Sequence, residues 1–62
     1  MRRLPRKATG LAGVKWYMQD DYLYAEADGR VMRVRVPGAA VLDQAVNLIS
    51  HRIRSLRYAA AH

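Results

Sequence analysis

Between residues 14 and 36, tyrosine, lysine and arginine alternate with apolar residues, and these polar side chains are the ones in the chain best suited to bind a ligand. The segment reads VKWYMQDDYLYAEADGRVMRVRV. Arginine donates paired hydrogen bonds to phosphates and to guanine edges, and tyrosine adds a flat ring with a polar tip. The chemistry that this pattern indicates is recognition of phosphates and base edges.

Residues for bond-making chemistry do not come together in the sequence. There is no cysteine, and the two histidines, His51 and His62, have no convincing partner. The one closely spaced acidic pair, Asp20 and Asp21, falls in a predicted turn. Acid–base catalysis, nucleophilic catalysis and zinc binding each need an arranged group of side chains. We therefore expect no enzyme activity, no metal site and no cofactor.

The alternation predicts three antiparallel β-strands joined by two tight turns. Asp28-Gly29 is a strong signal for a two-residue turn, since such a turn needs positive φ at both positions. Asp20-Asp21 is a weaker signal, and a longer first loop is the alternative. Both turns assign the same residues to the same face, although a shift of one residue would invert a strand. The apolar inner face is Val14, Trp16, Met18, Leu23, Ala25, Ala27, Met32, Val34 and Val36.

The opposite face of the predicted sheet carries the polar side chains. One row across the strands is expected to hold Tyr17, Tyr24 and Arg33. Lys15 is expected opposite Glu26, as an exposed ion pair that contributes little to stability. The residues of this face that we expect to bind a ligand are Lys15, Tyr17, Tyr22, Tyr24, Arg33 and Arg35.

A helical period replaces the alternation after Pro37-Gly38. Apolar residues recur at spacings of three and four, which predicts one amphipathic helix from about residue 39 to about residue 58. This helix is expected to cover the inner face of the sheet and to bury Trp16, which is large enough to anchor a small core. Neither Pro37 nor Gly38 has a side-chain acceptor to cap the helix. The apolar stripe is Leu42, Ala45, Val46, Ile49, Ile53 and Leu56, whereas Ser50, Arg54 and Arg57 lie off it.

These elements make a single α+β domain with the order βββα. A chain of 62 residues is long enough for one small core. We expect a flexible basic arm at residues 1–9, the βββα domain at residues 10–58 and a short tail at residues 59–62. Val41 and Leu48 lie at the flank of the helical stripe. A homodimer through the helix would bury them, and the alternative is that both lie at the edge of the monomer core.

The charge is strongly basic, with 11 lysines and arginines against 5 acidic residues and a net charge of +6. Such a balance favours phosphate-bearing polymers as partners. The arm contributes Arg2, Arg3, Arg6 and Lys7, which are expected to follow phosphates or the minor groove, or else to act as a solubilising tail. No apolar run has the length of a signal peptide or a membrane span. We expect a cytoplasmic protein, associated with the nucleoid if it is bacterial, with no membrane partner.

Three short motifs resemble those of a known family of DNA-binding domains. They are Gly13-Val14-x-Trp16, Leu23-Tyr24-Ala25-Glu26-Ala27 and Gly29-Arg30-Val31-Met32, followed by a C-terminal helix. Over roughly residues 10–52 the chain resembles the ethylene-response-factor type of domain, and its layout is similar to the arm-binding domains of tyrosine recombinases. The resemblance implies a three-stranded sheet in the DNA major groove with a helix behind it. The base-reading positions that it implies are Lys15, Tyr17, Arg33 and Arg35.

The sequence thus favours a small DNA-binding protein of bacterial or phage type, acting as a regulator or as a recombination accessory factor. The first alternative is a small inhibitor or adaptor protein, for example one encoded by a phage, that binds an acidic protein partner through the same face. Double-stranded RNA binding is the third hypothesis. It is weaker because RNA-binding domains of similar layout have a lysine-rich helix start, whereas this helix starts Gly38-Ala39-Ala40.

Overall fold

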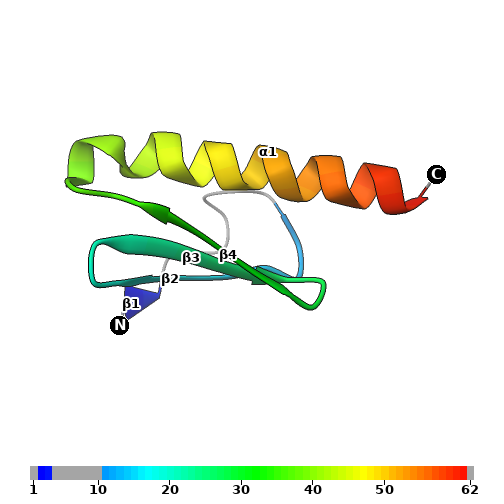
Figure 1. Ribbon diagram of the computed structural model, residues 1–62, viewed down its shortest axis with the longest axis horizontal. Coiled ribbons are helices and arrows are strands. Elements are labelled where there is room, and N and C mark those ends of the chain that lie inside the picture. The colour runs from blue at the N-terminus through cyan, green and yellow to red at the C-terminus, as the bar shows by residue number, and fades with distance from the viewer. Residues whose placement is uncertain (1, 4–10, 62) are drawn as a thin grey trace.

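One long helix lies across one face of an antiparallel β-sheet in the computed structural model, which describes residues 2–3 and 11–61 (Figure 1). The chain has the expected α+β fold, in which three hairpin-connected strands precede a C-terminal helix. The strands of this meander pair in the order β2, β3, β4. Its elements are β2 (Lys15–Gln19), β3 (Tyr22–Ala27), β4 (Arg30–Arg35), the short 3-10 helix η2 (Ala39–Val41) and α1 (Leu42–Ala61).

Both turns of the meander contain two residues, and this fixes the register. Asp28 and Gly29 have φ of 54° and 76°, and Asp20 and Asp21 have φ of 51° and 62°. Aspartate adopts positive φ more readily than most residues because its side chain can bond to the nearby backbone. The alternative of a longer first loop is therefore wrong. The end of β4 is also tied to this turn, since the N–H of Val36 donates to the carbonyl of Asp21 at 2.6 Å.

The core lies between the sheet and α1, where the predicted inner face meets the helical stripe. Leu23 and Ala25 of the central strand β3 have no exposed surface, and Trp16 is 3% exposed. The prediction that Trp16 belongs to the core is confirmed. The helix contributes Ala45, Val46, Ile49 and Ile53 to this core, and Met18, Met32, Val34 and Leu42 pack against its margin.

The helix differs from the prediction at both ends. Its start is a 3-10 turn, closed by the N–H of Val41 donating to the carbonyl of Gly38 at 3.2 Å, and Gly38 provides no side-chain cap. Its end is Ala61, so residues 59–61 are helical rather than part of a tail. Alanine has the highest helix propensity of all residues, which favours this extension. Among the described residues, no helix is long and apolar enough to cross a membrane.

A further strand, β1 (Arg2–Arg3), pairs with β2 and extends the sheet by one short edge strand. The Cα partners are Arg2 with Met18 and Arg3 with Tyr17. Both residues belong to the predicted arm, and the structure gives them a strand conformation. The reason is that β2 would otherwise present an unpaired edge, whose N–H and C=O groups an extended segment can satisfy. Arg6 and Lys7 lie outside the described residues.

Candidate nucleic-acid interface

Six of the predicted site residues lie on one surface, the face of the meander opposite α1 (Figure 1). We call this surface the outer face. The register sets its residues in three rows, each with one residue from each strand. The rows are Lys15–Glu26–Val31, Tyr17–Tyr24–Arg33 and Gln19–Tyr22–Arg35. Every cross-strand pairing expected for this face is present.

Three tyrosines form a connected aromatic cluster at the middle of the outer face. The rings of Tyr17 and Tyr24 are stacked, with centroids 5.0 Å apart and planes 7° apart. Tyr22 meets Tyr24 in a tilted arrangement, with centroids 6.4 Å apart and planes at 53°. All three side chains are half-buried by one another and by the sheet. Aromatic packing of this kind holds the rings in defined positions on the strand surface.

Arg33 joins this cluster through a cation–π contact. Its guanidinium carbon lies 4.7 Å from the centre of the Tyr22 ring, diagonally across the β3–β4 pair. A guanidinium group carries its N–H donors in the plane of the group. A cation–π contact uses none of these donors for a hydrogen bond, so they can still bond to a ligand. The side chain as a whole remains exposed to solvent.

Positive charge surrounds the aromatic cluster. Lys15, Arg33 and Arg35 are exposed, and Glu26 is the one acidic residue in the three rows. A hydrogen bond to the Glu26 carboxylate, together with burial, raises the pKa of the Tyr17 hydroxyl above its ordinary value of 10.0. Tyr17 therefore stays neutral and donates to Glu26. Lys15 and Glu26 are Cα partners as expected, and the Glu26 carboxylate is engaged by Tyr17, so the ion pair with Lys15 stays a prediction.

The predicted basic arm reaches this surface through its backbone. Arg3 is the Cα partner of Tyr17, so β1 places this residue beside the row that contains the stacked tyrosines, whereas Arg2 is the Cα partner of Met18. The binding role predicted for Arg2 and Arg3 stays a prediction. The same holds for Arg6 and Lys7, which lie outside the described residues.

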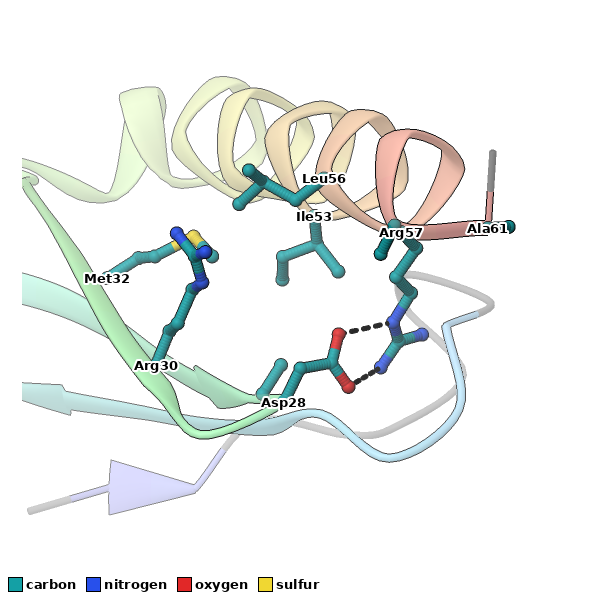
Figure 2. Close-up of a pocket in the computed structure, with 9 residues that line it drawn as sticks. Asp28, Arg30, Met32, Ile53, Leu56, Arg57 and Ala61 are labelled. Atoms are coloured by element: carbon teal, nitrogen blue, oxygen red, sulfur yellow. Dashed lines mark hydrogen bonds and ion pairs between the residues drawn. The ribbon is translucent and has the colours of Figure 1, made fainter.

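An ion pair between Asp28 and Arg57 was not predicted from the sequence. Figure 2 shows the two side chains meeting between the second turn of the meander and the last turns of α1. The Nε of Arg57 donates to Oδ2 of Asp28 at 2.8 Å, and Nη2 donates to Oδ1 at 3.2 Å. This bidentate contact lowers the pKa of the Asp28 carboxyl. It ties the helix to the hairpin and neutralises the charge of the turn.

Helix length is the sequence signal that could have revealed this pair. A helix of 20 residues is about 30 Å long, whereas a strand of six residues spans about 20 Å. The last turns of the helix must therefore reach the end of the β3–β4 hairpin. Asp28 is at the tip of that hairpin, and Arg57 is one turn after the core residue Ile53.

The two flanking apolar residues of the helix have different surroundings. Val41 is half-buried and packs against the core, as expected for the edge of a monomer core. Leu48 is 61% exposed. A homodimer through the helix stays a prediction. Among the described residues, no group of three or more histidine and acidic residues is placed to hold a metal ion.

Comparisons with protein-family models, curated proteins and solved structures gave no match to the chain. The resemblance to the ethylene-response-factor type of domain, and to the recombinase arm-binding domains, therefore stays a prediction.

Proposed function

We propose that this protein binds double-stranded DNA through the outer face of β2, β3 and β4. The observation that carries the proposal is the clustering of Arg33 with three packed tyrosines, next to the exposed cations Lys15 and Arg35. The helix lies on the opposite face, so the described elements leave this surface open (Figure 1). A net charge of +6 supplies the attraction to phosphates on which binding of this kind depends.

The spacing of the two arginines fits the repeat of a duplex. Arg33 and Arg35 are two residues apart on β4, so their side chains leave the strand on the same face about 7 Å apart. Adjacent base pairs are about 3.4 Å apart along the helix axis, so two steps cover the same distance. A β-sheet of this width can enter the major groove, where arginine bonds to guanine O6 and N7. With β4 aligned along the groove, the two arginines can therefore reach base edges about two steps apart.

Glu26 limits which parts of the face can approach phosphates. Its carboxylate is held by Tyr17 and would repel a phosphate in the row that it shares with Lys15. It can instead accept a hydrogen bond from the cytosine amino group in the major groove. We therefore assign base contacts to the row of Glu26 and to the middle row. Phosphate contacts fall to Arg35 at the opposite corner and to the basic arm.

Alanine substitutions at the two exposed arginines test this assignment. We expect Arg33→Ala and Arg35→Ala each to weaken duplex binding about fivefold or more, because each removes a charged donor from the interface. The matched control is Arg52→Ala, which removes the same charge from an exposed position of α1 on the opposite layer. Fluorescence anisotropy with a labelled duplex measures the affinity. Emission from Trp16, the single tryptophan, reports that each variant is folded.

Two results would count against the proposal. Equal losses in Arg52→Ala and in the two sheet variants would show that only the net charge matters. Unchanged affinity in both Arg33→Ala and Arg35→Ala would remove the outer face from the DNA interface. In the second case, a protein partner with an acidic surface becomes the better explanation for the tyrosines and arginines.

A further inference from the structure

β4 has one edge that no other described strand covers. The strand order is β1, β2, β3, β4, so β1 lies at the far side of the sheet and β4 ends it. In an antiparallel pair, alternate residues point their N–H and C=O groups toward the partner strand. Every second one of the six residues of β4 therefore presents its backbone groups outward. An unpaired edge of this length can accept another strand by main-chain hydrogen bonds.

An apolar groove runs beside this edge, between β4 and α1. Met32 and Val34 form its floor, and Leu48, which is 61% exposed, forms its wall on the helix. The groove has a volume of about 380 Å³. Met32 also lines a second hollow, which has a volume of about 480 Å³. Arg30 and Leu56 line this second hollow. Figure 2 shows Arg30 and Met32 extending from β4 toward Leu56.

The charges along β4 are all of one sign. The strand reads RVMRVR, with Arg33 and Arg35 on the outer face and Arg30 on the groove side, and it contains no acidic residue. Arg52 adds a further cation at the wall of the groove. A second copy of this strand, paired antiparallel along the edge, would bring arginines against arginines, and like charges on adjacent strands are destabilising. The edge is therefore protected from self-association but open to a strand of opposite charge.

We infer that the free edge of β4 and the groove beside it form a docking site for an extended segment of a partner protein in which acidic and apolar residues alternate. Side chains of an added strand alternate between the two faces of the sheet. Those on the outer side would meet Arg33 and Arg35, which requires carboxylates. Those on the other side would enter the groove over Met32 and Val34, which requires apolar groups. A carboxylate at the end of the segment would pair with Arg30.

This site overlaps the DNA interface at Arg33 and Arg35 of β4. Arg33 contacts the Tyr22 ring of the outer face and also lines the groove, and Arg35 would meet carboxylates of the added strand. Leu48 belongs to the docking site alone, because it lies on the helix layer. Leu48 is the position at which the two activities can be tested independently.

The probe is a synthetic peptide in which glutamate and leucine alternate. It is long enough to span the six residues of β4 and is flanked by prolines. We expect it to bind with micromolar affinity in an anisotropy titration. Binding should protect the backbone amides of β4 from hydrogen exchange. Two control peptides complete the design. One has the same composition in an order without alternation, and the other carries N-methyl groups on the amides that would face β4.

The matched protein variants are Leu48→Asp and Asn47→Asp. Both place one additional negative charge at an exposed position of α1, but only Leu48 lines the groove. We expect Leu48→Asp to weaken peptide binding about tenfold or more. Asn47→Asp should bind the peptide as the unaltered protein does. The two variants should have the same effect on the affinity for duplex DNA. This pattern separates loss of the docking site from loss of the DNA interface.

Three outcomes would overturn the inference. The first is equal binding of the alternating and reordered peptides, which would indicate attraction by charge alone. The second is equal binding of the N-methylated peptide, which would exclude strand addition. The third is a concentration-dependent dimer in sedimentation experiments that Leu48→Asp abolishes, which would make a second copy of the chain the occupant of the groove.

Discussion

Arg33 contacts the ring of Tyr22, although its direct cross-strand partner is Tyr24. The guanidinium carbon is 4.7 Å from the centre of the Tyr22 ring. Tyr24 is engaged on its other side by Tyr17, whose ring is stacked at 5.0 Å. The cation is therefore held in position before any ligand arrives. Groups that are ordered in advance lose less entropy when they bind, which favours affinity.

Removing the ring beneath Arg33 should weaken DNA binding without unfolding the protein. We expect Tyr22→Leu to lower the affinity for a duplex by about two- to fivefold, the equivalent of an exposed cation–π contact of about 0.5–1 kcal/mol. The matched control is Tyr22→Phe, which keeps the ring and should bind more tightly than Tyr22→Leu. Anisotropy titrations measure both. Identical affinities for the two variants would show that the ring does not position Arg33.

The alternation of residue types was sufficient to predict the sheet and its two faces. A strong turn at Asp28-Gly29 fixed one hairpin, and the apolar residues of the first strand could face the core in only one register. The outer rows follow from that register. The diagonal contact of Arg33 could not be predicted in the same way, because it depends on which neighbouring ring is left open by the Tyr17–Tyr24 stack.

The long-range contacts of the helix could not be predicted from the spacing of apolar residues. The spacing of apolar residues placed Ser50 and Arg57 off the stripe, but the structure buries Ser50 to 3% exposure and pairs Arg57 with Asp28. The width of the buried stripe depends on how the helix crosses the sheet, and periodicity does not specify the crossing. The pairing of β1 with β2 likewise depends on an open strand edge rather than on a hydrophobic period.

The Asp28–Arg57 ion pair should make stability depend on pH in the acid range. Because Arg57 lowers the pKa of Asp28 below its ordinary value of 3.8 in the folded state, the pair stabilises the fold at and above that value. The stabilisation is lost as the pH falls through the lowered pKa. We expect Arg57→Gln to unfold a few degrees below the unaltered protein at neutral pH, with the difference disappearing in strong acid.

Thermal unfolding followed by circular dichroism across this pH range measures the effect. Arg52→Gln is the control, since it removes the same charge from an exposed helix position that lies outside the pair. A constant difference between Arg57→Gln and the unaltered protein at all pH values would mean that Arg57 acts through packing of its stem rather than through Asp28.

Replacing Ser50 should stabilise the protein. The Ser50 side chain is buried, and its Oγ has no hydrogen-bond partner within the described part of the chain. Burial of an unpaired hydroxyl is unfavourable, and alanine is also the better helix former, so Ser50→Ala should raise the free energy of unfolding by about 1 kcal/mol. Chemical denaturation of Ser50→Ala and Ser55→Ala provides the comparison. The exposed Ser55 gains helix propensity only, so an equal or larger gain at Ser55 would contradict this account.

The dependence of duplex binding on salt is the most decisive measurement of DNA recognition by this protein. Random-sequence duplex DNA is titrated with the folded protein by fluorescence anisotropy between about 50 and 200 mM salt, where each neutralised phosphate contributes about −0.9 to the slope of log affinity against log salt. We expect binding at low salt with a slope of about −2 or steeper, since several cations of the outer face and arm release counterions together. If protein whose Trp16 emission shows a folded core does not bind at low salt, the outer face is not a DNA interface.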